Sequence, residues 1–157
     1  MPCRKIPIPT SALSLESLVV SKPDLTRSAT MRAVRGQGNK STEAVVAKLL
    51  AKAKLLGWRR HLPLPGTPDF AWPGLKVAVF VDGCFWHGCP RCNRPLPKTN
   101  SAFWAAKVAR NQRRDRASAR RLRALGWSVL RVWEHALSNP QRVLARIKRA
   151  LARNEAK

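Results

Sequence analysis

Eighteen residues from Asp82 to Thr99 (DGCFWHGCPRCNRPLPKT) follow neither a helical nor a strand pattern. A stretch of this length without regular structure is uncommon inside a compact domain unless something else organises it. Three cysteines lie in it, Cys84, Cys89 and Cys92, with the spacing C-x4-C-x2-C. Close spacing lets one loop wrap a tetrahedral ion, and zinc is a metal that suits thiolates. The sequence therefore predicts a loop organised by zinc.

A tetrahedral zinc site needs a fourth ligand, and the candidates are His87, His135 and Cys3. Cys3 lies in an N-terminal stretch that several prolines interrupt. His135 directly follows an apolar, strand-like segment, so the fold would fix its position. We therefore expect a structural site made by Cys84, Cys89, Cys92 and His135. Two alternatives stay open at this point, a redox-active CPRC pair and simple free or buried thiols.

The segments around this loop have regular hydrophobic patterns. Apolar residues at helical spacing predict helices from Ser41 or Thr42 to Leu56, over 101–125 and from Pro140 to Arg153. Short apolar runs predict strands over 58–62, 69–72, 75–81 and 127–133, with 75–81 (LKVAVFV) at the centre of the sheet. The order α-β-β-β-α-β-α indicates an α/β domain with a mixed sheet flanked by helices.

The net charge of the chain limits the classes of molecule that it is expected to bind. The formal net charge is +23, from 31 Lys and Arg against 8 Asp and Glu. Such an excess destabilises a compact chain by self-repulsion unless a polyanion binds, and nucleic acid is the usual one. A ribosomal or chromatin structural protein and a membrane-surface binder are the alternatives. Six tryptophans favour nucleic acid, because large rings stack on bases as well as fill cores. No run approaches the roughly 18 apolar residues of a membrane span.

Two of the acidic residues lie in the most apolar part of the chain. If 69–72 and 75–81 pair as a hairpin, Asp69 and Asp82 come to one end of the sheet. Oxygen ligands in that arrangement suit Mg²⁺, and His87 follows five residues after Asp82 as a candidate general acid or base. We expect folding to gather Asp69 and His87 around one divalent ion. The alternative is a turn residue, a strand-end residue and a surface histidine.

Six segments together resemble the very short patch repair (Vsr-type) DNA mismatch endonucleases. They are RAVRG (32–36), LPGTPDF (64–70), VFVDGCFWHGC (79–89), PKTN (97–100), FW (103–104) and GWSVLRVWEH (126–135). The resemblance runs from about Thr26 to Leu137. It implies a restriction-endonuclease-like α/β fold with a zinc-stabilised loop. It also implies Mg²⁺-dependent nicking of one DNA strand beside the thymine of a T:G mismatch, which leaves a 5′-phosphate.

The resemblance assigns roles to single positions. Asp69 matches the metal-binding aspartate, and the carbonyl of Val81 matches a further Mg²⁺ ligand. His87 matches the catalytic histidine, and Glu43 an acid that contacts the metal-bound water. Asp82 falls at a neighbouring catalytic position that is histidine in some members. The zinc ligands of the family match Cys84, Cys89, Cys92 and His135, which leaves His87 for chemistry.

The resemblance also implies a DNA interface. Phe85, Trp86 and Trp104 match aromatic residues that wedge into the DNA beside the mismatch, where a wobble pair is easier to unstack. The alternative for these rings is a place in the core or a cover over the zinc loop. Phosphate contacts that fix the register are expected from Arg32, Arg35, Lys40, Asn111 and Arg113.

Several wider expectations follow. Residues 1–25 are expected to be a disordered extension, 26–137 the endonuclease domain and 138–157 a basic C-terminal helix. The expected partners are T:G-mismatched duplex DNA and mismatch-repair proteins, with a monomer acting at the nucleoid in the bacterial cytoplasm and no membrane contact. The VDG segment lacks the lysine of the wider nuclease pattern. A zinc-stabilised DNA binder without catalysis, and a nuclease of this fold acting on matched DNA, therefore remain alternatives.

Overall fold

The computed structural model describes residues 42–156. The elements follow in the order α2 (Glu43–Lys52), β1 (Arg59–Arg60), β2 (Phe70–Trp72), the 3-10 turn η1 (Pro73–Leu75), β3 (Val77–Asp82), α3 (Ser101–Ala124), β4 (Ser128–Trp133), the 3-10 turn η2 (Glu134–Ser138) and α4 (Pro140–Glu155). This order confirms the predicted α-β-β-β-α-β-α arrangement. The predictions for Arg32, Arg35, Lys40 and residues 1–25 lie outside the described residues.

The four strands form one mixed sheet in the order β1-β2-β3-β4. β2 is antiparallel to both β1 and β3, whereas β3 runs parallel to β4. A parallel pair needs a crossover connection, and α3 lies within it. β3 lies between β2 and β4, and all of its residues except Val81 are buried. The expectation that this segment is the central strand is confirmed.

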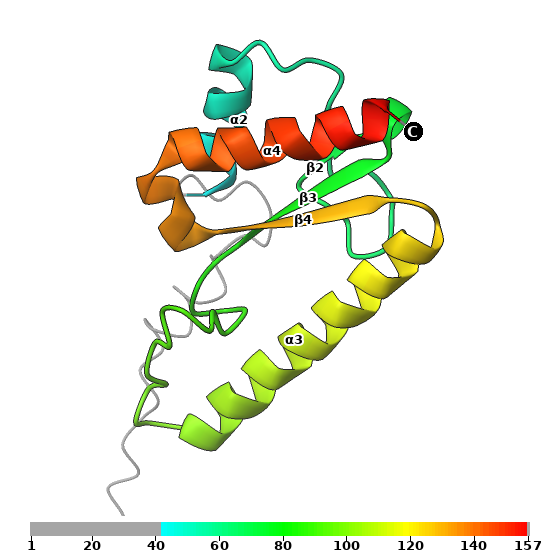
Figure 1. Cartoon of the computed structure of the whole chain (residues 1–157). Coiled ribbons are helices and arrows are strands. Elements are labelled where there is room, and N and C mark those ends of the chain that lie inside the picture. The colour runs from blue at the N-terminus through cyan, green and yellow to red at the C-terminus, as the bar shows by residue number, and fades with distance from the viewer. Residues whose placement is uncertain (1–41, 157) are drawn as a thin grey trace, which may run out of the picture. The chain divides into compact units, whose positions relative to one another are not determined.

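The two faces of β3 pack against different helices (Figure 1). Val77 and Val79 belong to a core shared with α2 and α4. Ala78 and Phe80 pack with Leu122 of α3. This alternation is the period of two that every strand has. The sheet is therefore the middle of three layers, with α2 and α4 on one side and α3 on the other.

Helix α2 ends four residues earlier than the apolar spacing predicts. Lys54 takes a left-handed conformation (φ 52°) that stops the helix after Lys52. The N–H of Leu55 donates to the carbonyl of Leu50 at 3.1 Å, and the N–H of Lys54 donates to that of Ala51 at 3.0 Å. This is a Schellman motif, in which glycine usually occupies the left-handed position. A lysine there gives no signal in the sequence.

Close backbone contacts fix α3 against two loops. A Cβ atom on Gly66 would lie 2.7 Å from Cβ of Ser118, and one on Gly88 would lie 2.4 Å from Nε2 of Gln112. Carbon atoms do not approach other heavy atoms this closely in folded proteins, so both positions need glycine. The loop before β2 and the cysteine loop after β3 are therefore held against the same helix.

No helix among residues 42–156 is long and apolar enough to cross a membrane.

Candidate active site and zinc centre

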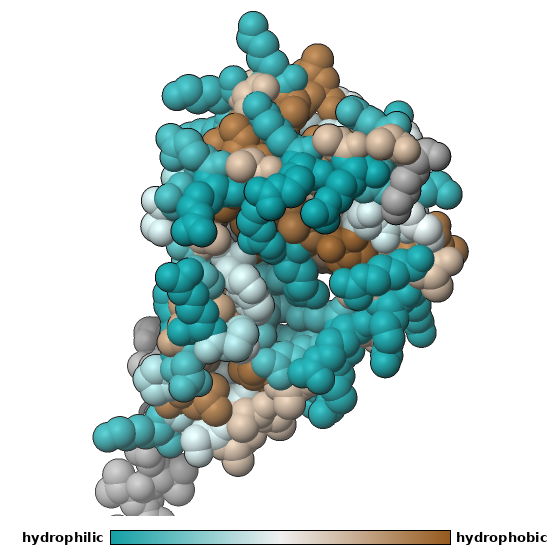
Figure 2. Space-filling view, viewed as in Figure 1, coloured by the Kyte–Doolittle hydropathy of each residue, from teal (hydrophilic) through white to brown (hydrophobic). Residues whose placement is uncertain are grey.

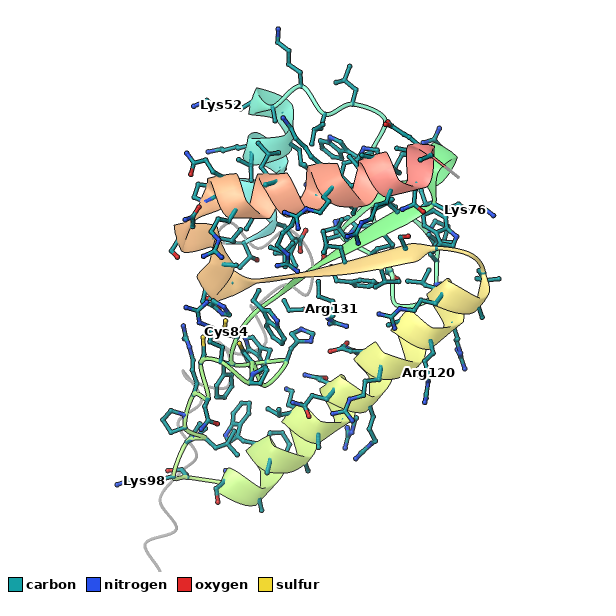
Figure 3. The ribbon with its side chains drawn as sticks, in the orientation of Figure 1. Lys52, Lys76, Cys84, Lys98, Arg120 and Arg131 are labelled. Carbon is teal, nitrogen blue, oxygen red and sulfur yellow. The ribbon has the colours of Figure 1, made fainter. Side chains whose placement is uncertain are left out.

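The four predicted zinc ligands gather at the carboxyl ends of β3 and β4. The Sγ atoms of Cys84, Cys89 and Cys92 lie 3.3, 3.5 and 3.3 Å from Nδ1 of His135. Tetrahedral zinc with its usual bond lengths would place sulfur and nitrogen about 3.5 Å apart. The four residues gather as predicted, and the donor set and its spacing fit a structural zinc ion. Figure 3 shows the sulfur atoms beside the label of Cys84.

Strand register explains why residues so far apart in the chain meet. Asp82 and Trp133 are partners at the ends of the parallel strands β3 and β4. Cys84 and His135 each come two residues later, so they leave the sheet side by side. The N–H of Cys84 also donates to Oε2 of Glu134 at 2.9 Å. The sheet thus fixes two ligands, and the loop supplies the other two.

The thiols respond differently to this environment. Burial raises the pKa of Cys84 to about 12. Burial opposes ionisation of Cys89 as well, but the backbone N–H groups of Cys92 and Arg91 outweigh it and lower the pKa of Cys89. Thiolates are the form that binds zinc, so zinc binding must release the proton of Cys84.

A first carboxylate cluster, here called the Asp69 cluster, consists of Glu43, His61 and Asp69. Each offers one ligand atom, and these atoms all lie within 4.8 Å of one another. Glu43 begins α2, His61 follows β1 and Asp69 precedes β2. Nη2 of Arg60 donates to Oε2 of Glu43 at 2.7 Å, and Nε2 of His61 lies 3.5 Å from the same oxygen.

The carboxyl group of Asp69 ionises less readily than that of an ordinary aspartate. Its burial, and the charges of Glu43 and Asp82, raise the pKa of Asp69 to about 6, even though the N–H of Val81 donates to its Oδ2 at 2.7 Å. A carboxyl in such surroundings favours a proton or a cation. Nδ1 of His61 is buried and has no hydrogen-bond partner among the described residues. The raised pKa of Asp69 and the two carboxylates of the cluster fit a divalent cation such as Mg²⁺.

A second cluster, the Asp82 cluster, consists of Asp82, His87 and Asp115, again with ligand atoms within 4.8 Å of one another. Nδ1 of His87 lies 2.6 Å from Oδ2 of Asp115 and 3.6 Å from Oδ1 of Asp82. Nε and Nη2 of Arg131 donate to the two oxygens of Asp82, each at 2.5 Å. Nη2 of Arg131 also lies 3.2 Å from Oδ2 of Asp115. A guanidinium therefore already compensates this cluster.

Hydrogen bonds and ion pairs within the Asp82 cluster shift the pKa values of Asp115 and Arg131. Burial opposes the charge of Asp115, but the hydrogen bond to His87 and the charge of Arg131 outweigh it and lower the pKa of Asp115. Burial also opposes the charge of Arg131, and Asp82 reverses the effect and raises the pKa of Arg131. An ionised Asp115 accepts a hydrogen bond from Nδ1–H of His87, and the tautomer with its proton on Nδ1 has its lone pair on Nε2. No described residue hydrogen bonds to that nitrogen.

Asp69 and His87 lie in neighbouring clusters. The group that surrounds Asp69 contains Glu43 and His61, whereas His87 groups with Asp82 and Asp115. Asp82 connects the two clusters, because its charge raises the pKa of Asp69 and its Oδ1 lies near His87. Figure 3 shows Arg131 reaching from β4 toward α3, the helix that carries Asp115.

Four aromatic rings from the cysteine loop and α3 form a separate cluster. Phe85 and Trp86 from the cysteine loop and Phe103 and Trp104 from α3 have neighbouring ring centroids 5.2 to 5.8 Å apart. Nζ of Lys107 lies 5.3 to 5.8 Å from three of these ring centroids. Phe103 is 58% exposed. Neither hydrophobic core cluster contains any of the four rings.

Helix α3 contacts the loop on one side and faces solvent on the other. Nδ2 of Asn111 donates to the carbonyl of Trp86 at 2.9 Å, so the amide predicted to contact phosphate also positions the loop. Nε2 of Gln112 donates to the carbonyls of His87 and Gly88. Arg113 is exposed. Figure 2 shows hydrophilic residues along this helix.

Three residues at the site escaped the sequence analysis. Asp115 is the single acid in the very basic α3, and Arg131 is the single charge in the apolar strand β4. Each of these isolated charges was a usable signal. His61 follows two arginines in a short segment and carried no signal of its own.

Comparisons with known proteins find a family of DNA endonucleases. A family model described as DNA mismatch endonuclease Vsr matches residues 21–94. The type II nicking enzyme V.NaeI of Lentzea aerocolonigenes is 43% identical over 117 residues, which are 69% of this chain and 68% of the relative. The DNA mismatch endonuclease Vsr of Escherichia coli is 37% identical over 118 residues, 75% of each chain. The type II nicking enzyme V.XorIIP of Xanthomonas oryzae is 36% identical over 124 residues, 77% of this chain and 88% of the relative.

Proposed function

The chain belongs to the Vsr family of DNA nicking endonucleases, and from this premise we propose that it nicks one strand of duplex DNA next to the thymine of a T:G mismatch. The observation that carries the proposal is the aromatic cluster on the same loop and the same helix as the His87–Asp115 pair. Rings that belong to no core cluster, at a site able to move a proton, suit an enzyme that unstacks its substrate before cutting it.

The Asp69 cluster is the proposed site of the divalent ion. Asp69 and Glu43 would hold Mg²⁺, with the carbonyl of Val81 as a further ligand. When bound, Mg²⁺ polarises the phosphate and stabilises negative charge on the leaving oxygen. Asp82 is a weaker candidate ligand, since both of its oxygens accept hydrogen bonds from Arg131.

The Asp82 cluster is the proposed proton-transfer site. Nε2 of His87 accepts a proton from the attacking water, whose oxygen bonds to phosphorus as the bond from phosphorus to the 3′-oxygen breaks. This outcome leaves a 5′-phosphate, and the leaving 3′-oxygen takes a proton from solvent water to become the 3′-hydroxyl. Asp115 orients the imidazole and stabilises its cationic form, as the carboxylate of a catalytic triad does. Asp82 and Arg131 are positioning residues for Asp115.

Mismatch selectivity would come from Phe85, Trp86 and Trp104. Rings inserted between base pairs pay an unstacking cost, and that cost is smaller at a T:G wobble than at a matched pair. Arg113 and the arginines of α3 would hold backbone phosphates without reading sequence. We place the activity in the bacterial cytoplasm at the nucleoid, because the relatives are bacterial and a thiolate zinc site needs a reducing compartment.

A second function is favoured by the names of two relatives, which describe type II nicking enzymes without reference to a mismatch. Three labelled duplexes that differ only in one pair, T:G, C:G or T:A, separate the two functions in the presence of Mg²⁺. A single nick in the T:G duplex alone supports the proposal. Equal nicking of all three favours a matched-DNA enzyme. Binding without nicking, in wild type and Asp69→Asn alike, would leave only a DNA-binding protein.

A further inference from the structure

A groove that the proposed chemistry does not use lies beside the zinc centre. It encloses about 630 Å³ between the cysteine loop, η2 and the first two turns of α4. Three of the residues that line it are arginines, Arg91 from the loop and Arg142 and Arg146 from α4. No aspartate or glutamate lines it. All three arginines are exposed, so their guanidinium groups are accessible from solvent.

The charges of this groove have no internal counterpart. Among residues 42–156, none of the three arginines forms an ion pair with a carboxylate. The one hydrogen bond that the structure gives their guanidinium groups runs from Nη2 of Arg146 to the carbonyl of Arg131 at 3.2 Å. Three neighbouring cations without an anion repel each other, and a bound polyanion relieves that repulsion.

The spacing within the groove suits a chain of phosphates. Arg142 and Arg146 are four residues apart on one helix, which places their Cβ atoms about 6 Å apart on the same face. Arg91 comes from a different element, the loop that the zinc ligands hold. The groove therefore presents cations from two elements, and a strand of sugar and phosphate lying in it could contact both.

The groove also lies at the catalytic end of the sheet. Trp133 lines it and is the strand partner of Asp82, while Cys92 and His135 line it and belong to the zinc centre. In Figure 1, η2 and the start of α4 lie next to the loop after β3. We propose that this groove binds the backbone of the substrate duplex on one flank of the nick, as a second contact beyond the catalytic clusters. The inference rests on the proposed function in that DNA is the substrate.

Salt dependence of binding tests the groove with a matched control. The variant Arg142→Ala/Arg146→Ala removes two groove charges. Arg149→Ala/Arg153→Ala removes two exposed charges with the same spacing, two turns further along α4 and outside the groove. A labelled 30-base-pair T:G duplex is titrated without divalent ions from about 50 to 200 mM salt. The logarithm of the association constant falls linearly with the logarithm of the salt concentration. The groove variant should make this negative slope shallower by about two, and the control by less than about one.

Equal slopes for the two variants would overturn the proposal. Arg91→Ala, with Arg94→Ala as its control in the same loop, repeats the test in case the helix variants are unstable. The negative salt slope should become shallower by about one for Arg91→Ala and stay unchanged for Arg94→Ala. Equal slopes for these two variants count against the groove in the same way.

A neutral-phosphate scan locates the contact. Single methylphosphonates placed along both strands should weaken binding by wild type at one or two adjacent flanking positions and leave the groove variant unaffected there. Equal losses for both proteins at every position would overturn the proposal. If wild type does not nick the T:G duplex but the groove and control variants still differ in slope, the proposed function is wrong while the groove contact stands.

Discussion

The Asp69 cluster and the Asp82 cluster lie at one end of the same sheet, and they treat negative charge in opposite ways. In the Asp82 cluster, the hydrogen bond to His87 and the charge of Arg131 lower the pKa of Asp115. In the Asp69 cluster, Arg60 pairs with Glu43, but burial and neighbouring acids raise the pKa of Asp69 to about 6. Ion pairs hold a proton-transfer pair in place in the first cluster, whereas the raised pKa of Asp69 favours a cation in the second. This difference separates the proposed metal site from the proposed proton-transfer site.

The largest expected effect comes from Asp69→Asn, which removes the charge of the carboxylate and keeps the size and shape of the side chain. Nicking of the T:G duplex should fall by at least about a thousandfold, or about 4 kcal/mol of barrier. Mn²⁺ binding, measured by electron paramagnetic resonance, should weaken in parallel. Asp82→Asn is the comparison, and its Mn²⁺ affinity should stay close to wild type. Equal losses of Mn²⁺ binding in both variants would remove the division between the clusters.

The next effect is on stability, through Arg131→Met. The substitution leaves the carboxylate of Asp82, which is only 3% exposed, without its cation. We expect the free energy of unfolding to fall by about 3 kcal/mol in urea denaturation. Adding Asp82→Asn to this variant should restore most of the loss, since the buried charge is gone. A single variant as stable as wild type would show that the ion pair does not compensate this cluster.

A smaller effect is expected for Asp115→Asn. The amide cannot accept the Nδ1 proton as a carboxylate does, so the imidazole loses its favoured tautomer. Nicking should fall by about a hundredfold at saturating Mg²⁺, while Mn²⁺ affinity stays unchanged. Arg116→Gln, an exposed change one residue away, serves as the control. Loss of Mn²⁺ binding in Asp115→Asn would move the metal site toward the second cluster.

The smallest effect is a pH dependence of stability in the absence of Mg²⁺. Because folding raises the pKa of Asp69 from 3.8 to about 6, the folded state binds its proton more tightly than the unfolded state. The stabilisation is therefore complete below about pH 4 and is lost as the pH rises through 6, by roughly 2–3 kcal/mol. Glu43, Asp82 and His61 are further ionisable side chains in these surroundings, so the quantity to measure is the difference between wild type and Asp69→Asn. A difference that is flat from pH 4 to 7 would contradict the raised pKa.

The parts of this protein that sequence could predict are those with local signals. The apolar run 75–81 gives the central strand, and the close spacing of three cysteines gives the zinc loop. Gly126, with φ of 80°, ends α3 where the pattern places it. Each of these signals lies within a few residues of the structure that it specifies, so no knowledge of the fold is needed to read it.

The remaining parts depend on contacts between distant segments. Arg131 and Asp82 are separated by 49 residues, and His87 and Asp115 by 28. Only the parallel register of β3 with β4, and the packing of α3 on the cysteine loop, bring these pairs together. A periodicity analysis finds the elements but not how they are aligned, and for that reason Arg131 and Asp115 escaped it.

The glycine at position 88 ties backbone packing to chemistry over a distance. Helix α3 is about 36 Å long, and Gly88 meets it at Val108 and Gln112, two turns and one turn before Asp115. A methyl group on Gly88 would lie 2.8 Å from Cγ1 of Val108 and 2.4 Å from Nε2 of Gln112, so these side chains would have to move. Because Nε2 of Gln112 donates to the carbonyls of His87 and Gly88, an alanine at position 88 would disturb the backbone that carries the imidazole without altering any reacting group.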